Sequence, residues 1–351
     1  MNVVYNPDSF SLLGIATLPN FSHDDRTRKI DFGAITELVR DDMRVTDALI
    51  EKQLHSDVAL VNQVARYIVH SGGKRLRPLL VLLGSHVFGD GEESRIALAA
   101  IIEFIHTATL LHDDVVDASG LRRGQETANT LWGNEASVLV GDFLYSRSFQ
   151  MMVKVGNMRI MQIFADTTNV IAEGEVMQLL NCNDPETTEE RYLQVIRAKT
   201  AKLFEAAAQM GAVIHERPPE EQQAMAAFGL HMGTAYQLID DVLDYRGEID
   251  EIGKNVGDDL AEGKPTLPLI YAIRVGEQYQ ASAIRAAVRE GQRGEIQNII
   301  RTVESTGAIA YTAAAARKEA DLALEALKVI SNSRYRDALE DLVEFSIGRT
   351  Y

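Results

Sequence analysis

Residues 110–117 read LLHDDVVD, and residues 238–244 read LIDDVLD. Both stretches hold the pattern Asp-Asp-x-x-Asp between apolar residues, and we call them the first and second aspartate motifs. Positions i and i+4 of an α-helix lie on one face, so Asp113 and Asp117 would project in the same direction. The apolar neighbours predict helices that are largely buried. We therefore expect two core helices, each of which presents a pair of carboxylates on one side.

Paired carboxylates on a buried helix call for a cation, because like charges repel and are costly to desolvate. Hard divalent ions suit sites made of oxygen, and Mg²⁺ in particular is held by a few carboxylates together with phosphate oxygens of a substrate. Two facing motifs could clamp metal ions around a diphosphate and stabilise the charge that develops as it leaves. The alternative is a solvated acidic face or helix caps, which explains a single motif better than two copies inside apolar helices.

The rest of the chain also favours helix. Its eight prolines leave long stretches in which nothing forbids helix, and these stretches are rich in Ala, Leu, Glu, Gln and Met. Strand signals are weak, because the Asp-Gly pair at residues 90–91 leads into a helix-like run. We predict one all-α domain, a bundle of roughly ten or more helices over residues 31–351, after a loosely ordered extension over residues 1–30.

The composition narrows the possible functions. The formal net charge is −16, and because a nucleic-acid partner needs a basic footprint, we expect no nucleic acid. The single cysteine, Cys182, excludes an intramolecular disulfide framework and a zinc site with several thiolates. No apolar run approaches the ~18 residues that span a bilayer, so we do not expect an integral membrane protein. An anionic substrate would need local cations or bound metal in so acidic a protein.

Basic residues gather near both aspartate motifs. Residues 72–78 read GGKRLRP and place three cations in a loop that Pro78 turns into a helix, a location that favours anion binding. Arginine suits phosphate because its fork can bind two oxygens at once. Each cation alone is better explained as a surface residue, and only their placement around the motifs points to a site. The further cations are Arg122, Arg123, Lys199, Lys254 and Lys264.

In their order along the chain these motifs resemble those of the trans-isoprenyl (polyprenyl) diphosphate synthases, over roughly residues 35–350. The resemblance rests on the two aspartate motifs and on GGKRLRP at 72–78, RRG at 122–124, KT at 199–200, GKNVGDDL at 253–260 and EGKPTLP at 262–268. Three longer runs are similar to members of the family that make an octaprenyl product, namely residues 103–117, 136–152 and 170–180.

The resemblance implies an isoprenoid synthase fold, with helices around a central cavity, and a Mg²⁺-dependent prenyltransferase. Such an enzyme adds isopentenyl diphosphate units in sequence to an allylic diphosphate, with farnesyl diphosphate as the expected primer. The expected product is octaprenyl diphosphate for quinone side chains, and a nonaprenyl or geranylgeranyl product is the alternative. The family also implies a homodimer in the cytoplasm, whose product partitions into the membrane.

The resemblance also implies roles for individual residues. The magnesium ligands would be Asp113, Asp117 and Asp240, with Asp114, Asp241 and Asp244 nearby. The allylic diphosphate would be held by Arg122, Lys199, Thr200, Gln237, Lys254 and Lys264. Isopentenyl diphosphate would be held by Lys74, Arg77, His106 and Arg123. The residues expected to matter most for catalysis are Asp113, Asp114, Asp117, Lys199, Asp240 and Asp241.

Two small residues just before the first aspartate motif could determine the product length. Ala108 and Thr109 lie five and four residues before Asp113, about one helical turn below the diphosphate. Small side chains there would leave a channel open for the growing chain, although a close helix–helix contact explains an alanine equally simply. With the family resemblance added, we expect Ala108→Tyr to shorten the product.

Other classes of protein share parts of this pattern of motifs. A metal-dependent phosphohydrolase could use His112 and Asp113 as a dyad with His70 or His106, but it leaves the second aspartate motif unexplained. A ferritin-like di-iron bundle would need a second copy of the Glu-x-x-His element at residues 103–106, and none is evident. A nucleotide-binding loop fails on spacing. A regulatory subunit should lack one motif, and a terpene cyclase should lack the basic loop.

Overall fold

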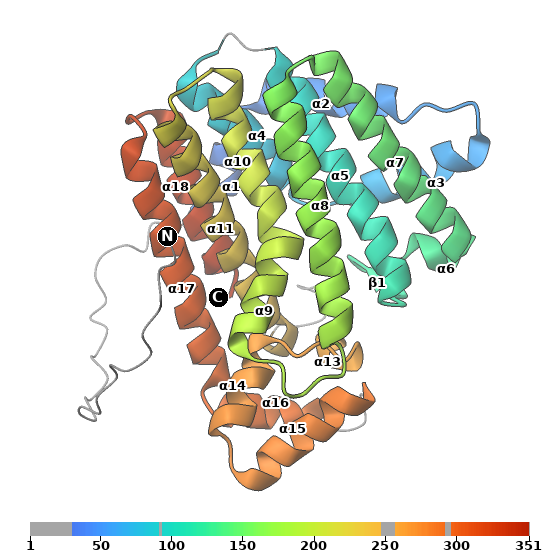
Figure 1. The fold of residues 1–351 in the computed structure, drawn as a ribbon, viewed down its shortest axis with the longest axis vertical. Coiled ribbons are helices and arrows are strands. Elements are labelled where there is room, and N and C mark those ends of the chain that lie inside the picture. The colour runs from blue at the N-terminus through green and yellow to red at the C-terminus, as the bar shows by residue number, and fades with distance from the viewer. Residues whose placement is uncertain (1–29, 91–92, 247–256, 292–295, 351) are drawn as a thin grey trace, which may run out of the picture. The chain divides into compact units, whose positions relative to one another are not determined.

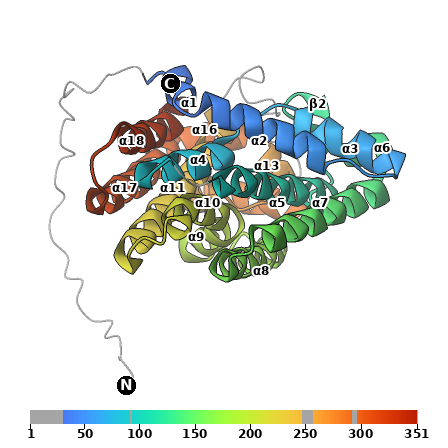
Figure 2. The ribbon, with the colours of Figure 1, turned by 90° about the horizontal axis from the view of Figure 1, so that it is seen from above.

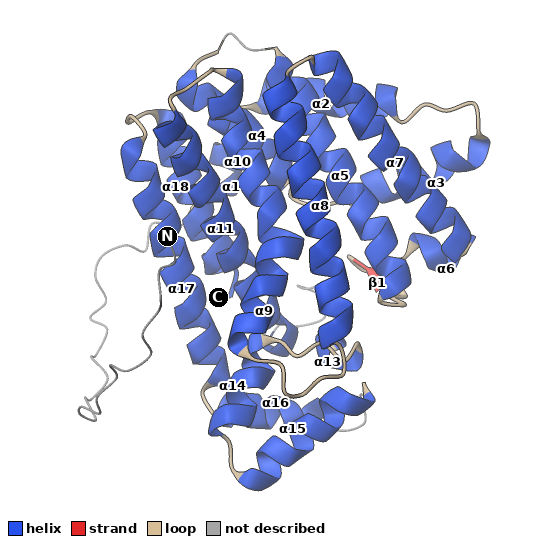
Figure 3. Ribbon diagram, in the orientation of Figure 1, coloured by secondary structure: helices blue, strands red, loops and turns tan. Residues whose placement is uncertain are grey.

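The computed structural model describes residues 30–90, 93–246, 257–291 and 296–350, and these residues are almost entirely helical (Figure 3). The all-α prediction is therefore confirmed. Those described from Asp31 onward pack as one compact unit. Residues 1–29 of the predicted extension lie outside the described residues.

The order of elements is that of Figure 1. The first part of the chain contains α1 (Phe32–Glu37), α2 (Arg40–Gln53), α3 (Ala59–His70), α4 (Leu76–Phe88), α5 (Ser94–Val116), β1 (Leu121–Arg122), β2 (Gln125–Glu126), α6 (Ala128–Trp132), α7 (Asn134–Val155) and α8 (Met158–Asn181). The second part contains α9 (Glu189–Ile196), the π-helical segment η1 (Arg197–Ala201), α10 (Lys202–Ile214), α11 (Pro219–Arg246), α13 (Asp258–Ala261), α14 (Leu267–Val275), α15 (Gln278–Glu290), α16 (Ile296–Ser305), α17 (Ala308–Ala326), η2 (Leu327–Val329), α18 (Arg334–Ile347) and η3 (Gly348–Thr350).

Helices α4, α5, α10 and α11 form the centre of the bundle (Figures 1 and 2). Helix α10 packs against the other three, and glycines bring some of these helices very close together. A β-carbon added to Gly211 of α10 would lie 2.2 Å from the carbonyl carbon of Gly84 in α4, so the two backbones are in direct contact. The two helices that carry the aspartate motifs, α5 and α11, both lie against α10.

Helices α13 to α16 form a smaller apolar cluster with the end of α11. Leu260 of α13 and Leu269 of α14 pack with Val242 and Tyr245 of α11, and all four side chains are buried. Burial of apolar surface is the main force that holds such short helices in place. The cluster therefore fixes the segment after α13, which carries Lys264, close to the second aspartate motif.

The apolar character of α5 corrects one expectation from the sequence. Helix Ser94–Val116 is long and apolar enough to cross a membrane by length and composition, whereas no such run was expected. In the structure, 61% of its most apolar window is buried inside the protein, and it packs on α4, α7 and α10. Helix α5 is thus a core helix whose apolar residues face other helices.

A short β-hairpin follows α5 and was not expected from the sequence. Leu121 pairs with Glu126 and Arg122 with Gln125, so the turn consists of Arg123 and Gly124. Their φ angles are 54° and 74°, and positive φ at both central residues is typical of the tight type I′ turn. The signal was present in the Arg-Gly pair, but two-residue strands are too short to give an alternating pattern.

Helix α2 carries a partly buried charge, Asp42, whose contribution to stability can be measured. Asp42 of α2 accepts hydrogen bonds from Arg95 of α5 at 2.7 Å and from His86 of α4 at 2.7 Å. Burial alone would raise the pKa of Asp42, but the hydrogen bonds and charges of these partners outweigh it and lower the pKa. A lowered folded pKa means that the stabilisation is present above the unfolded pKa and is lost as pH falls through the folded pKa.

We expect Asp42→Asn to lower the melting temperature at pH 7 by about 2–4 °C, since hydrogen bonds to a charged group contribute ~1.5–3 kcal/mol and the entropy of unfolding of a chain of this length is large. The difference from the wild type should shrink as the pH falls below about 4, the pKa of an unfolded aspartate, because the wild-type carboxylate then loses its charge as the pH passes through the lower folded pKa. Circular dichroism melts at pH 7 and pH 3 measure both quantities. Asp41→Asn is the control, because Asp41 is 91% exposed and its ion pair with Arg44 is long, at 3.8 Å. Equal shifts in the two variants would contradict the assignment.

Candidate active site

A cavity of about 560 Å³ lies where α4, α5, α8, α9, η1 and α11 meet the loops that follow α3 and α13. Asp113 of α5 and Asp117, which caps the end of α5, line it, as do Asp240 and Asp241 of α11. Every predicted substrate-binding residue among the described residues also lines it, namely Lys74, Arg77, His106, Arg122, Arg123, Lys199, Thr200, Gln237 and Lys264. The remaining predicted residue, Lys254, lies outside the described residues. Charged groups from distant parts of the sequence therefore face one space.

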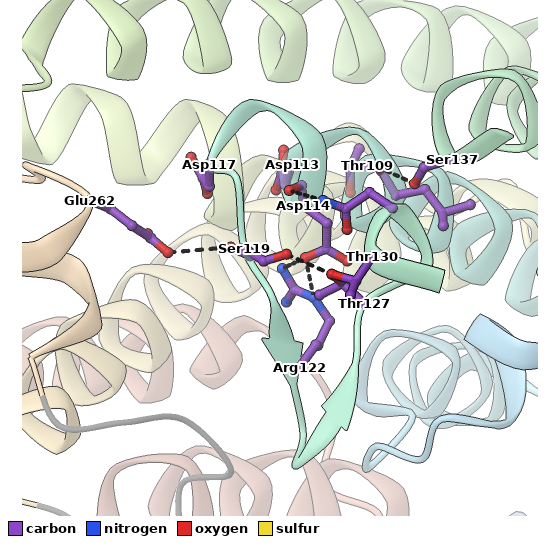
Figure 4. Close-up of polar contacts among 12 residues, drawn as sticks. Thr109, Asp113, Asp114, Asp117, Ser119, Arg122, Thr127, Thr130, Ser137 and Glu262 are labelled. Atoms are coloured by element: carbon purple, nitrogen blue, oxygen red, sulfur yellow. Dashed lines mark hydrogen bonds and ion pairs between the residues drawn. The ribbon is translucent and has the colours of Figure 1, made fainter. Parts of the chain in front are cut away.

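The first aspartate motif presents two of its three carboxylates to this cavity. Figure 4 shows Asp113 and Asp117 on one side of α5, with Asp114 on the other. Lys264 Nζ lies 2.7 Å from Asp117 Oδ2, and Lys199 Nζ lies 3.4 Å from Asp113 Oδ2. The predicted i, i+4 pair is thus oriented as expected, and each carboxylate faces a lysine from another part of the chain.

Asp114 points away from the cavity and holds Arg122 in the hairpin (Figure 4). Its side chain is fully buried, and its Oδ1 accepts from Arg122 Nε at 2.8 Å and Nη2 at 2.6 Å. Burial raises the pKa of Asp114, although the charge of Arg122 opposes this. Within the part of the chain that the structure describes, Oδ2 has no hydrogen-bond partner. This geometry favours Asp114 as a support for Arg122 rather than as a metal ligand, the role predicted for it.

Lys199 bridges α5 and α8 across the cavity. Its Nζ lies 2.6 Å from Glu175 Oε2 of α8, a residue that the sequence did not single out. Burial alone would lower the pKa of Lys199, but the charges of Asp113 and Glu175 outweigh it and raise the pKa. Burial and the charge of Asp113 raise the pKa of Glu175 to about 7. Two carboxylates and one ammonium group therefore share this wall of the cavity.

Lys199 and Thr200 lie in the π-helical segment η1. Thr200 Oγ1 donates to Gln237 Oε1 at 3.1 Å, and Gln237 Nε2 donates to Asp241 Oδ1 at 2.9 Å. π-Helical turns within α-helices are rare and are frequent at functional sites. Through these two hydrogen bonds η1 is connected to the second aspartate motif.

The second aspartate motif divides its carboxylates among different partners. Asp240 Oδ1 lies 2.9 Å from Nη2 of Arg349. Asp241 is buried, and its Oδ2 accepts a hydrogen bond of 2.5 Å from the Tyr192 hydroxyl. Burial and the charge of Asp259 raise the pKa of Asp241 to about 8. Asp244 is also buried and is absent from the cavity lining, so the geometry does not support its predicted role as a metal ligand.

A separate group of cations occupies the side of the cavity next to α4. Helix α4 begins at Leu76, so Arg77 belongs to its first turn, whereas the sequence placed it in the preceding loop. Arg77 Nη1 lies 3.2 Å from His106 Nε2, and since arginine can only donate, the imidazole accepts. Burial and the charge of Arg77 lower the pKa of His106 well below its usual value. His106 is therefore a neutral partner of Arg77.

Glu103 is the carboxylate that faces this basic group. It is 7% exposed and forms an ion pair with Arg75, which also donates to the Val69 carbonyl at 3.0 Å. Arg75 has a φ of 49°, an unusual conformation for a residue other than glycine. The ion pair holds the loop before α4 in place. Glu103 and His106 have different partners here, so they do not form the metal-binding pair of a di-iron bundle.

His112 does not form the dyad that a phosphohydrolase would need. Its Nε2 lies 3.2 Å from the Val138 carbonyl oxygen and 3.2 Å from Asp142 Oδ1, both in α7. A β-carbon on Gly141 would lie 2.4 Å from the same nitrogen, so the imidazole packs directly on the α7 backbone. His112 is also absent from the cavity lining. Because His112 packs on α7 and does not face the cavity, the structure does not support a phosphohydrolase that uses it.

The two residues predicted to control product length differ in position. Thr109 lines the cavity, and its hydroxyl donates to the His106 carbonyl at 2.8 Å. Ala108 is fully buried and is not part of the lining. The role of Thr109 is compatible with the shape of the cavity, whereas Ala108 could act only if the channel extended beyond the space that is open here.

Several cavity residues have no counterpart among those predicted. They are Glu103, Glu175, Tyr192, Tyr236, Asp259, Glu262 and Arg349. Glu262 lies 2.6 Å from Lys264, and Arg349 lies with its guanidinium carbon 3.9 Å from the centre of the Tyr236 ring. Glu175 lies within residues 170–180, a run that is similar to the family but in which no single residue was predicted to act. Nothing in the local sequence around Arg349 indicates that it reaches the cavity.

The donor atoms on the two motif helices suit a hard divalent cation. Asp113, Asp117 and Asp240 offer carboxylate oxygens to one cavity, and the His106 imidazole, which also lines it, is paired with Arg77. Within the described ranges, no group of three or more His, Cys, Asp or Glu side chains is arranged to hold a metal ion on its own. Magnesium is typically shared between a few carboxylates and substrate phosphates, and the residues present fit that chemistry.

Comparison with known proteins yields a consistent set of relatives. The family model described as polyprenyl synthetase matches residues 58–303. The octaprenyl diphosphate synthase of Escherichia coli (strain K12) is 48% identical over 316 residues, which cover 90% of this chain and 98% of that protein. The geranyl-diphosphate-specific all-trans-nonaprenyl-diphosphate synthase of Rhodobacter capsulatus is 45% identical over 312 residues, which cover 89% of this chain and 96% of that protein.

The fold is equally well matched among solved structures. The polyprenyl synthase from Caulobacter crescentus CB15, complexed with calcium and isoprenyl diphosphate, superposes with a TM-score of 0.89 at 41% identity. The match covers 92% of this chain and 100% of the Caulobacter crescentus chain. Relatives at similar identity are named for products of different length, so overall identity alone does not determine the product.

Proposed function

Since this chain belongs to the polyprenyl synthetase family, we propose that it is an all-trans octaprenyl diphosphate synthase. It adds isopentenyl diphosphate units head to tail to an allylic diphosphate, with farnesyl diphosphate as the primer. The long product is the kind of chain that quinone biosynthesis attaches to its ring. The observation that carries the proposal is the convergence of both aspartate motifs and two groups of cations on one cavity.

Magnesium is the ion that we propose for the motif carboxylates. Asp113 and Asp117 from α5 and Asp240 from α11 would hold it. When bound, Mg²⁺ would neutralise the allylic diphosphate and stabilise the charge that builds up as it departs. Lys199 and Lys264 already lie against the carboxylates of the first motif, so both ammonium groups are within reach of a diphosphate held there.

Arg122 supplies a further donor on the same side. The buried carboxylate of Asp114 fixes the Nε edge of its guanidinium. A guanidinium that is held in this way loses little freedom when it binds phosphate, which favours tight binding. We therefore assign Arg122, Lys199, Thr200, Gln237 and Lys264 to the allylic diphosphate.

The second substrate would lie on the α4 side, against Lys74, Arg77 and Arg123. Arg77 is oriented by neutral His106 and stacks over the Phe204 ring, with its guanidinium carbon 4.4 Å from the ring centre. Its Nε has no hydrogen-bond partner in the described part of the chain, although it is buried. Buried donors normally have partners, so a bound anion is a reasonable partner for this one.

The reaction then needs only positioned charges. The C1–O bond of the allylic diphosphate breaks, the double bond of isopentenyl diphosphate supplies the electron pair for the new C–C bond, and one proton leaves the adjacent carbon. We assign that proton to the departing diphosphate. No protein nucleophile takes part, and the enzyme contributes proximity and electrostatic stabilisation, which are large effects in closed sites.

The test is an elongation assay. Purified enzyme is incubated with farnesyl diphosphate, labelled isopentenyl diphosphate and Mg²⁺, and the dephosphorylated products are sized. A magnesium-dependent ladder that ends at the octaprenyl product supports the whole proposal. A ladder that ends at another length keeps the chemistry and changes the product. Folded enzyme that forms no new C–C bond with metal present would overturn the proposal.

We also propose that the enzyme is a homodimer in the cytoplasm. Helices α7 and α8 lie on the same side of the bundle (Figure 2) and expose several large apolar side chains. These are Leu139, Val153, Met158, Val176, Leu179 and Leu180, each more than half exposed, at 58–75%. Exposed apolar groups gathered on one side of a protein are typical of an interface between subunits.

Leu139→Glu is expected to convert a dimer into a monomer, because it would bury an unpaired charge in the interface. Light scattering after gel filtration measures the mass directly. Leu322→Glu is a matched control, since Leu322 is 40% exposed on α17, away from this side of the bundle. A Leu139→Glu variant that remains dimeric, or a monomeric wild type, would contradict the proposed interface.

A further inference from the structure

The helix that carries Lys199 is unusual at the position where it meets the cavity. Helix α9, the π-helical segment η1 and helix α10 follow one another directly along the chain, with no loop between them. A π-helical turn holds an extra residue, so the side chains on one side of it are rotated relative to a regular α-helix. Such a segment persists only when its surroundings stabilise it over the α-helical alternative. The direction of the Lys199 side chain therefore depends on what holds η1.

Glycines on two neighbouring helices allow η1 to approach closely. A β-carbon on Gly174 of α8 would lie 2.8 Å from the Lys199 backbone nitrogen, and one on Gly233 of α11 would lie 2.7 Å from the α-carbon of Ala201. Both distances are too short for any larger residue, so η1 is confined between α8 and α11. These contacts limit sideways movement of η1, but packing against glycine does not fix its rotation.

A polar contact on a third helix can fix that rotation. Arg197, the first residue of η1, donates from Nη2 to Glu319 Oε1 of α17 at 2.9 Å. The other carboxylate oxygen of Glu319 lies 2.6 Å from Nδ1 of His231 in α11. Glu319 is 8% exposed. Burial alone would raise its pKa, but the hydrogen bonds and charges of His231 and Arg197 lower it, so Glu319 is ionised.

We propose that the Arg197–Glu319 ion pair is a positioning device for the allylic diphosphate site. Arg197 points to α17, while two residues later Lys199 points to Glu175 of α8 and to Asp113 of α5. The two side chains thus anchor opposite sides of the same π-helical turn. Loss of the outer anchor lets η1 relax towards regular α-helix, which turns the Lys199 ammonium away from the cavity. The inference rests on the proposed function, because it assigns the pair to binding of one substrate.

The structure predicts that only one of the two substrates depends on this pair. Lys199 and Thr200, the residues of η1 that face the cavity, belong to the side assigned to the allylic diphosphate. The cations assigned to isopentenyl diphosphate are held by other contacts, such as Arg77 by His106. A defect in η1 should therefore weaken allylic binding and leave isopentenyl binding nearly unchanged, whereas general loss of stability would affect both.

The test compares Arg197→Met with Arg317→Met. Arg317 also forms an ion pair from α17, with Glu344 at 2.7 Å, and it is 39% exposed against 43% for Arg197, but its partner lies in α18. Calorimetry with Mg²⁺ and the unreactive thio-analogues of farnesyl and isopentenyl diphosphate gives a dissociation constant for each. We expect Arg197→Met to weaken farnesyl analogue binding about 10-fold, the size of one charge-assisted hydrogen bond, and to change isopentenyl binding less than about twofold.

Arg317→Met should leave both constants near their wild-type values. Equal farnesyl analogue binding in the two variants would overturn the proposal, as would a loss in Arg197→Met that is equal for both analogues. Should Arg197→Met fail to fold, Glu319→Gln is judged by the same two criteria, because it removes the charge that Arg197 meets. A wild type that binds no allylic analogue would overturn the proposed function together with this inference, whereas farnesyl analogue binding in Arg197→Met that is as tight as in the wild type overturns this inference alone.

Discussion

Replacement of Asp117 by asparagine is expected to lower kcat/KM for elongation about 10³-fold, which is typical when a group that stabilises developing charge is removed. Asp117 faces the cavity and lies 2.7 Å from Lys264, so its charge acts at the proposed diphosphate position. Asparagine keeps the shape but is a weak ligand for a hard cation. The Mg²⁺ concentration for half-maximal rate should therefore rise as well. Rates measured across a Mg²⁺ series give both quantities.

Asp114→Asn is the informative comparison for Asp117→Asn. Asp114 is equally part of the motif, but its carboxylate binds Arg122 and points away from the cavity. The variant should raise KM for the allylic diphosphate and lower the melting temperature, because a buried ion pair is broken. Its Mg²⁺ requirement should stay near that of the wild type. A similar rise in Mg²⁺ requirement for both variants would contradict the division of roles within the motif.

A tyrosine at Thr109 is expected to shorten the product markedly. Thr109 lines the cavity one helical turn from Asp113, and an aromatic ring there would occupy the space into which the chain grows. Because that space is open, the melting temperature should change little. The measurement is the length distribution of products from farnesyl diphosphate and labelled isopentenyl diphosphate.

Ala108→Tyr is expected to shorten the product too, but at a cost in stability. Ala108 is fully buried, and enlarging a packed side chain typically costs ~1–3 kcal/mol. Its melting temperature should therefore fall below that of Thr109→Tyr. Octaprenyl product in both variants would contradict a channel along this face of α5. A short product in Thr109→Tyr alone would show that the channel does not reach Ala108.

The aspartate motifs were predictable because their geometry is local. A carboxylate at i and another at i+4 must share a face of a helix, and the apolar neighbours of Asp113 and Asp117 require burial. The cations could be grouped only through their order along the chain, and the structure does bring Lys199 and Lys264 to this motif. The all-α fold followed from composition and from the spacing of breaks.

The features that were missed depend on contacts between distant segments. Glu175 and Arg349 reach the cavity because α8 and η3 pack beside it, and no local pattern reports such packing. The π-helical turn at Lys199 packs closely against Gly174 and Gly233, which lie 25 residues before and 34 residues after Lys199 in the chain. The opposite orientations of Asp113 and Asp114 were available from helix geometry, but the partner that gives Asp114 its role, Arg122, was not.

The apolar nature of α5 has a consequence during synthesis. Helix Ser94–Val116 leaves the ribosome before α7 and α10, the partners that later cover it. Roughly 100 further residues must be translated before α10 is complete, which takes about 5–20 s at elongation rates of ~5–20 residues per second. Throughout that interval the nascent chain displays a segment with the composition of a membrane anchor. The yield of folded protein in cells should therefore depend on chaperones that shield such segments until the last central helices emerge.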